Sequence, residues 1–266
     1  MTASINFRKH TIQYHKIGNG SKIMLAFHGF GQTGEDFIPL GKVIAKDFTI
    51  YSFDLFYHGK SYWSIGNERL TKRFWRDFIS EFTTTHDINN FSLCGFSLGA
   101  KFALATLEAY PERVEKIVLI APDGIKTRMW YSLATYPIIL KSYFKSMIVK
   151  PQRFFNLVNL LKKTGLMEKG ILKFATNQMN TIKKRRRVYY AWVVFKELSF
   201  DIKKISKLIN KFDIETTIFL GRHDKIITQK GMKILIGLLR NYKLHILDSG
   251  HNRLIEKVAE WLKAGS

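Results

Sequence analysis

The sequence predicts an α/β protein built on a parallel β-sheet that helices cover on both faces. Short apolar runs alternate with helical patterns through the first 121 residues, the order typical of this class. These runs are mainly apolar and do not alternate regularly with polar residues, as in strands buried on both faces. Hydrophobic residues make up 46% of the 266 residues, which supplies one large core and excludes a disordered chain.

The elements expected before residue 122 follow one another as strand, helix and strand. The first strand ends at His28-Gly29, and the next helix has Glu35 and Asp36 in its first turn. Pro111 ends the last helix of this part. The expected strands are 23–27, 48–53, 91–94 and 114–121, and the expected helices are 33–46, 70–84 and 98–109.

The alternation stops at Pro122 and resumes after Phe212. Strands are expected at 216–220 and 243–247, and helices at 228–239 and 253–263. The simplest organisation is a sheet domain of residues 1–121 and 213–266, interrupted by a helical insertion of residues 122–212. The insertion has 20 Lys and Arg against 4 Asp and Glu, so it carries most of the net charge of +22.

Composition and the N-terminal sequence indicate which kinds of metal, disulfide or cofactor site to expect and in which cellular compartment the protein acts. One cysteine excludes a disulfide framework and a cysteine-rich zinc site, and no metal-ligand cluster stands out, so neither a metal nor a cofactor is expected. The first residues contain no apolar signal-peptide run. The longest uncharged stretch of the insertion, 129–140, is short of the roughly 20 residues that span a bilayer. We therefore expect a cytoplasmic protein.

The segment Gly95-Phe96-Ser97-Leu98-Gly99 fits the motif G-x-S-x-G between an expected strand and an expected helix. Small glycines permit a cramped turn that exposes the serine hydroxyl, and the Leu98 amide at the helix start faces a developing oxyanion. Ser97 is therefore the predicted nucleophile. The alternative is a tight turn with a serine that caps the helix. Cys94, inside the expected strand, is interpreted as a packed side chain.

A serine nucleophile needs a base that is held by an acid. His251 follows the last expected strand and Asp224 the one before, so both are expected at the ligand-binding edge of the sheet. We predict His251 as the base and Asp224 as its acid. Asp248 and Asp123 remain competitors for the acid, and His251 could instead cap the last helix. His223 is expected only to shape its loop.

A second glycine-rich turn, His28-Gly29-Phe30-Gly31, follows the first expected strand. Glycines let backbone amides approach an anion, so the Phe30 amide is the predicted second oxyanion donor beside Leu98. His28 is expected to hold this loop in place.

Together these motifs resemble the α/β-hydrolase superfamily, in its capped, cofactor-free branch. The resemblance covers roughly residues 1–121 and 213–266, and rests on the segments 28–31, 54–61, 95–99, 221–224 and 250–251. It implies an eight-stranded, mostly parallel sheet with a helical cap inserted after strand six. The segment 54–61 resembles a structural loop of the family, so His58 is not expected to be catalytic. After His251, this chain has Asn252-Arg253-Leu254 where the family often has an aromatic residue and a proline.

The resemblance implies an enzyme that cleaves a small or medium carboxylic ester through a Ser-His-Asp triad and an acyl-enzyme. A serine at position 97 argues against haloalkane dehalogenases and epoxide hydrolases, which use a carboxylate nucleophile. Thioesterases, C–C bond hydrolases, lyases of the menaquinone-pathway type and a non-enzymatic ligand receptor of the same fold remain alternatives.

The basic clusters of the insertion, 162–163 and 183–187, leave several partners open. A solvated helix face is the plainest interpretation. Weak contact with an anionic membrane surface is an alternative, because an apolar block at 188–195 follows the second cluster and indicates an interfacial helix. An anionic substrate is another alternative. Nucleic acid is not expected, because no reader motif is present. Aromatic residues of the insertion, such as Trp130, Phe144, Tyr189 and Trp192, are expected to pack the cap or to line an apolar acyl pocket.

Overall fold

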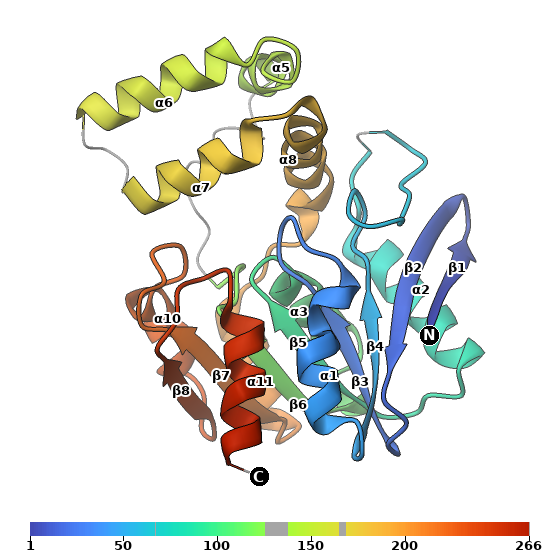
Figure 1. The fold of residues 1–266 in the computed structure, drawn as a ribbon. Helices are drawn as coiled ribbons and strands as arrows, with labels where there is room; N and C mark the ends of the chain where they lie inside the picture. Colours follow the sequence, from blue (N-terminus) through green and yellow to red (C-terminus); the bar gives the residue numbers. More distant parts are fainter. Residues whose placement is uncertain (67, 126–137, 165–168, 266) are drawn as a thin grey trace. The chain divides into compact units, whose positions relative to one another are not determined.

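The sheet of this chain has eight strands, as expected. The computed structural model describes residues 1–66, 68–125, 138–164 and 169–265 (Figure 1). The strand order is β1-β2-β4-β3-β5-β6-β7-β8, and β2 is antiparallel to both of its neighbours while all other pairs are parallel. The strands are β1 (Thr2–Phe7), β2 (His10–Ile17), β3 (Lys22–Phe27), β4 (Phe48–Phe53), β5 (Phe91–Phe96), β6 (Val114–Ile120), β7 (Glu215–Gly221) and β8 (Lys243–Leu247).

Helices lie on both faces of the sheet. On one face α1 (Ile38–Ile44) contacts α11 (Leu254–Ala264), and on the other α3 (Gly99–Ala109) contacts both α2 (Lys72–Thr85) and α9 (Ile202–Lys211), which in turn contacts α10 (Gln229–Ile236) (Figure 1). The predicted α/β class with a mostly parallel sheet is therefore confirmed. Strand β5 is buried throughout and β6 is buried from Ile117 to Ile120, which explains why these stretches are mainly apolar.

Aromatic side chains fill much of the core between the sheet and α2. Phe27 stacks on Phe53 at a centroid distance of 5.5 Å, and Trp75 of α2 lies edge-on to Phe27 at 5.6 Å. The indole N–H of Trp75 donates to the Thr106 hydroxyl at 2.9 Å, so α2 and α3 are joined by a buried hydrogen bond. This packing fixes the ends of β3 and β5, from which the candidate site is built.

By its internal contacts the chain forms two compact units. The first contains residues 1–64, 71–126 and 198–266, and the second contains residues 65–70 and 127–197. Of the predicted insertion, residues 127–197 thus group with the second unit, and residues 122–126 and 198–212, including α9, with the first.

The second unit is helical where the structure describes it. Its helices are α5 (Ile138–Ser146), α6 (Gln152–Thr164), α7 (Lys169–Met179) and α8 (Ile182–Val194). Val158, Leu161 and Leu172 form a small core between α6 and α7. Phe144 of α5 packs on Tyr189 and Trp192 of α8 at 5.4 and 5.6 Å. These three aromatic residues therefore pack within the unit, while Trp130 lies outside the described residues.

Candidate active site

Ser97 occupies a cramped turn between β5 and α3. Its φ is +50°, in the left-handed region that side chains other than glycine rarely adopt. The flanking glycines are required by the close approach of backbone. A Cβ added at Gly95 would lie 2.6 Å from the Cα of Ala100, and one at Gly99 would lie 1.9 Å from the carbonyl oxygen of Phe27. The sequence around Ser97 therefore permits a turn that larger residues would prevent.

Three of the predicted residues lie within hydrogen-bonding distance in series. Ser97 Oγ lies 2.8 Å from Nε2 of His251, and Nδ1 of His251 lies 2.6 Å from Oδ2 of Asp224. They follow β5, β8 and β7 respectively, at the carboxyl edge of the sheet. The side chain of Asp224 is fully buried and that of His251 is 9% exposed, so bulk water screens their interaction little.

Backbone amides hold the Asp224 carboxylate in place. Its Oδ1 accepts hydrogen bonds from the amides of Ile226 at 2.7 Å and Ile227 at 2.9 Å, which leaves Oδ2 for the imidazole. A carboxylate only accepts, so the proton in the second contact belongs to Nδ1 of His251 and Nε2 is left as an acceptor for the Ser97 hydroxyl. The local chain therefore selects the tautomer that a general base requires.

The two competing carboxylates lie elsewhere. The side chain of Asp248 is 79% exposed and accepts from His223 at 2.7 Å, in agreement with a loop role for His223. Asp123 binds its neighbour's amide, that of Gly124, at 2.8 Å, and its own amide donates to the carbonyl of Ser97 at 3.0 Å. Asp123 also lies 3.7 Å from the ammonium of Lys101. It therefore contacts the turn but not the imidazole.

The predicted oxyanion donors sit in two neighbouring turns. Phe30 and Leu98 are both half-buried, and within the described part of the chain neither backbone N–H has a hydrogen-bond acceptor. The Phe30 amide shares its peptide plane with the carbonyl of Gly29. That carbonyl lies 2.7 Å from Nδ1 of His28 and also accepts from the amide of Gln32 at 3.3 Å. Because the peptide unit is planar, holding the carbonyl also fixes the direction of the Phe30 N–H.

A buried polar network anchors the loop between β3 and α1. His28 is fully buried, and its Nε2 accepts the amide of Leu55 at 2.9 Å. The Asp54 carboxylate accepts from the amides of Gly34 at 2.8 Å and Lys60 at 3.1 Å. His58 of the 54–61 segment is buried, its Nδ1 lies 3.0 Å from the carbonyl oxygen of Phe56, and its ring packs edge-on to that of Phe30 at 5.2 Å.

Two further residues contact the candidate site and were not predicted from the sequence. Phe96 packs on His251 at a centroid distance of 5.1 Å, and a Cβ at Gly29 would lie 2.7 Å from its ring. Gln32 accepts the Gly29 amide through Oε1 at 2.9 Å. Phe96 lies within the G-x-S-x-G segment, so that motif could have indicated it. No sequence signal indicates Gln32.

Burial also makes Cys94 a packed residue. Its side chain is inaccessible, and burial raises the pKa of its thiol from 9.0 to about 12. The reactive thiolate is therefore scarce at neutral pH. Among the described residues, the structure contains no cluster of three or more His, Cys, Asp or Glu that could hold a metal ion.

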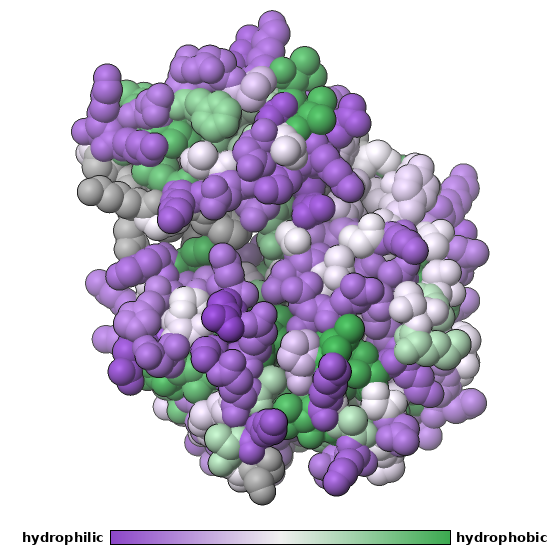
Figure 2. Space-filling model, in the orientation of Figure 1, coloured by the Kyte–Doolittle hydropathy of each residue, from purple (hydrophilic) through white to green (hydrophobic). Residues whose placement is uncertain are grey.

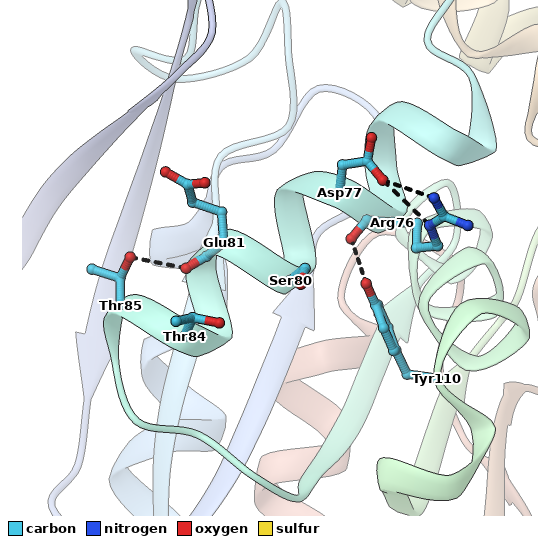
Figure 3. A pocket seen from close by; sticks show the side chains of 7 residues that line it. All are labelled: Arg76, Asp77, Ser80, Glu81, Thr84, Thr85 and Tyr110. Carbon is cyan, nitrogen blue, oxygen red and sulfur yellow. Dashed lines mark hydrogen bonds and ion pairs between the residues drawn. The ribbon is translucent and has the colours of Figure 1, made fainter.

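A cavity of about 600 Å³ on the outer side of α2 is separate from Ser97 (Figure 3). Its side chains are polar and several are paired with each other or with nearby backbone. Tyr110 donates to the carbonyl of Arg76 at 2.9 Å, and Arg76 pairs with Asp77 at 3.1 Å (Figure 3). The lining of this cavity contains no histidine, whereas Ser97, His251 and Asp224 lie together at the carboxyl edge of the sheet.

Comparison with known proteins identifies the family. The family model described as alpha/beta hydrolase fold matches residues 22–258. Poly(3-hydroxyalkanoate) depolymerase of Ectopseudomonas oleovorans is 23% identical over 244 residues, which cover 88% of this chain and 79% of the depolymerase.

Solved structures show the same fold. A thermophilic esterase from Thermogutta terrifontis has a TM-score of 0.70 at 14% identity, covering 99% of this chain and 96% of the esterase. A meta-cleavage product hydrolase from Pseudomonas fluorescens has a TM-score of 0.65 at 19% identity, covering 99% of this chain and 95% of the hydrolase. The chain belongs to the alpha/beta hydrolase fold family, and it is an enzyme of that family.

Proposed function

We propose that this enzyme is a serine hydrolase that cleaves a small or medium carboxylic ester through an acyl-enzyme intermediate. The observation that carries the proposal is the hydrogen-bonded series from Ser97 through His251 to Asp224. This series matches the order of nucleophile, base and acid that serine hydrolases use.

In the acylation step, Ser97 Oγ attacks the ester carbonyl carbon while Nε2 of His251 takes the hydroxyl proton. Asp224 stabilises the imidazolium that forms, because its Oδ2 lies 2.6 Å from Nδ1. The amides of Phe30 and Leu98 donate to the tetrahedral oxyanion. The imidazolium then gives its proton to the leaving alcohol, and the carbonyl forms again as the ester of Ser97.

In the deacylation step, a water molecule attacks the Ser97 ester and His251 takes its proton. Collapse of the second tetrahedral intermediate releases the carboxylic acid and returns the proton to Ser97. Each oxyanion donor contributes on the order of 3–4 kcal/mol to stabilisation of the transition state. The bound amides at Oδ1 keep Asp224 oriented through both steps.

Two observations support an ester as the substrate class. The relative from E. oleovorans acts on poly(3-hydroxyalkanoate). The nucleophile position is a serine, and the half-buried residues Phe30 and Leu98 lie in the two neighbouring turns. Their backbone amides suit the oxyanion that forms from an ester carbonyl. The helical second unit follows β6 in the chain, and we assign it the role of the cap that selects the acyl group.

The direct test is hydrolysis of p-nitrophenyl esters from acetate to octanoate by the wild type and by Ser97→Ala. The wild type is expected to release p-nitrophenol with a burst, because the acyl-enzyme accumulates. Ser97→Ala is expected to lower kcat by about a millionfold, to the background level. A folded Ser97→Ala protein that keeps wild-type activity would overturn the proposal. Thermal unfolding of both proteins checks that the substitution leaves the fold intact.

A further inference from the structure

The second unit has an unbalanced positive charge. Residues 65–70 and 127–197 contain 16 Lys and Arg against 3 Asp and Glu. Within the described part of this unit the acidic residues are Glu68 and Glu197, and Glu197 pairs with Arg69 at 2.6 Å. Most cations of the unit therefore have no acidic partner available inside it, and the surplus attracts an external anion.

Some of this charge surrounds a cavity between α5, the turn after it, and α8. The cavity has a volume of about 450 Å³. Lys145 and Arg186 line it and are both exposed, and neither has an acidic partner among the described residues. Ser142, Ser146 and Tyr190 also line it, and the Ser146 hydroxyl donates to the carbonyl of Tyr143. Two cations with the exposed hydroxyl-bearing side chain of Ser142 beside them match the charge and hydrogen-bonding needs of a phosphate group.

The cavity is fixed in shape by α8. The guanidinium of Arg185 is buried and donates to the carbonyls of Ile148 at 2.8 Å and Met179 at 3.1 Å. These bonds tie the turn after α5 to the start of α8. The neighbouring Arg186 is exposed and lines the cavity together with the buried Ile148.

Exposed apolar side chains lie on the surface next to the cavity. Val149, which also lines the cavity, is 74% exposed, and Leu160 of α6 is 57% exposed. Arg153 of α6 donates to Ser146 at 2.6 Å, which places this side of α6 next to the cavity. Leu157 and Leu160 follow Arg153 at positions i+4 and i+7, on the same side of the helix. Figure 2 shows hydrophobic residues interspersed with hydrophilic ones over α5 and α6.

This surface differs from the interfacial helix that the sequence indicated. In the apolar block 188–195, Val188, Tyr189 and Val194 are buried inside the second unit. That block therefore packs the unit together, and these buried side chains are not available to enter an interface. The exposed apolar residues instead belong to α6 and the turn between α5 and α6.

We propose that this face of the second unit binds the surface of a membrane that contains anionic phospholipid. The basic–apolar face comprises Lys145, Val149, Arg153, Leu157, Leu160 and Arg186. Lys145 and Arg186 bind the phosphate of one lipid headgroup in the cavity, and Val149, Leu157 and Leu160 enter the interface. Anionic lipid is the occupant that satisfies both features, because soluble phosphate leaves the apolar residues in water. The inference is independent of the proposed hydrolysis.

The test is sedimentation of the full chain with vesicles of phosphatidylcholine alone or mixed equally with phosphatidylglycerol. Binding is expected only with the anionic vesicles, and it weakens as salt is added. Lys145→Glu combined with Arg186→Glu is expected to lower the partition coefficient by at least about 25-fold, since each cation lost near the surface changes it by about fivefold. The matched control is Lys207→Glu combined with Lys230→Glu, which makes the same charge change at two exposed lysines of the first unit.

The apolar part of the face is tested by Val149→Asp against Ile234→Asp, at an exposed isoleucine of α10. The first is expected to weaken binding by about fivefold or more and the second to leave it within about twofold. Equal loss in the face variants and their controls would overturn the proposal, and so would absent or composition-independent vesicle binding. Complete competition by equimolar glycerophosphate would assign the cavity to a soluble phosphate. RNA binding without vesicle binding would assign the face to nucleic acid.

Circular dichroism and thermal unfolding show whether each variant folds. Hydrolysis of a water-soluble ester is expected to stay at the wild-type level in the face variants. Failure of that hydrolysis in every protein, including the wild type, would count against the proposed function and leave the vesicle result unaffected.

Discussion

The Nδ1 atom of His28 lies 2.7 Å from the carbonyl oxygen of Gly29, its own neighbour in the chain. The other ring nitrogen, Nε2, accepts the amide of Leu55 at 2.9 Å, so the proton of the neutral ring belongs to Nδ1, which donates to Gly29. A buried side chain thus holds the peptide plane that carries the Phe30 amide. This relationship makes His28 a positioning residue for the proposed oxyanion site.

His28→Phe is expected to lower kcat for ester hydrolysis by about tenfold to a hundredfold, less than the loss of a whole oxyanion donor. The substitution removes the hydrogen bond from His28 to the carbonyl of Gly29, which fixes the direction of the Phe30 N–H. Because that N–H donates to the oxyanion, the transition state is affected more than substrate binding. KM is expected to stay within about threefold. Steady-state kinetics on a p-nitrophenyl ester checks this split. An unchanged kcat in folded His28→Phe would show that Gln32 alone positions the loop.

Gly99→Ala is expected to destabilise the protein by about 3 kcal/mol or more, because the new Cβ would meet the carbonyls of Phe27 at 1.9 Å and His28 at 2.7 Å. The matched control is Gly231→Ala in α10, where the nearest atom lies at 3.8 Å. That change is expected to stabilise the protein by about 0.5–1 kcal/mol, because alanine favours the helix. Urea unfolding of both variants measures the two shifts. Similar free energies of unfolding would contradict the close packing of the Ser97 turn.

Asp224→Asn is expected to reduce kcat by about 10⁴-fold, because an amide at this position no longer selects the base tautomer of His251. Asp248→Asn serves as the control, since Asp248 is exposed and pairs with His223. That variant is expected to retain kcat within about twofold. Both are measured with the same ester under the same conditions. If Asp248→Asn proves to be the impaired variant, the acid has been assigned to the wrong carboxylate.

Burial of Cys94 makes the free energy of unfolding depend on pH in the alkaline range. Burial raises the pKa of the thiol to about 12 in the folded chain, from 9.0. The unfolded chain therefore loses this proton first, and the contribution of Cys94 is fully present below pH 9.0 and is lost as the pH rises toward 12. Cys94→Ala is expected to show a smaller decline in free energy of unfolding across this interval, measured by urea unfolding at about pH 8 and about pH 10.5.

Thiol labelling gives an independent check on the same burial. Iodoacetamide is expected to label Cys94 only when the chain is unfolded in guanidinium chloride, with the adduct detected by mass spectrometry. Rapid labelling of the native protein at neutral pH would contradict the buried, protonated thiol. An identical alkaline decline in the wild type and Cys94→Ala would do the same.

The continuous apolar strands were the most predictable part of the fold. Five of the six parallel strands, β3, β4, β6, β7 and β8, were located to within about a residue, and the C-terminal end of β5 was placed two residues short. Mainly apolar runs located these strands, including β8, of which only Leu247 is buried. β1 and β2 were not located. β1 is an edge strand that alternates exposed with half-buried residues, and the first four residues of β2 alternate buried with half-buried. Ile12 and Tyr14, two residues apart in β2, are the alternating signal that could have indicated that strand.

The candidate site residues were predictable where a suitable residue type directly follows an expected strand. Ser97, Asp224 and His251 each follow a strand, so topology alone brings them to one edge. The choice between Asp224 and Asp248 depends on which carboxylate faces the ring, and chain spacing does not contain that information. The contact of Phe96 with His251 depends on packing between β5 and the loop after β8.

The surface of the second unit was predictable in charge but not in geometry. The cluster at 183–187 indicated a basic helix, yet Arg185 is buried and hydrogen-bonded while Arg186 is exposed at a cavity. Neighbouring residues of a helix point in directions about 100° apart, so identical side chains meet different surroundings. Which arginine is structural depends on the packing of α5 against α8.

Among the described residues, none of the helices combines the length and the hydrophobicity that a membrane span requires.

The measurement that tests the central claim most directly is covalent labelling with a fluorophosphonate probe, followed by mass spectrometry of the peptide that contains Ser97. The account predicts stoichiometric labelling of Ser97 in the wild type and almost none in folded His251→Ala, because the hydroxyl is activated by the imidazole 2.8 Å away. Absence of labelling in the folded wild type, or equal labelling in His251→Ala, would contradict an activated serine at this site.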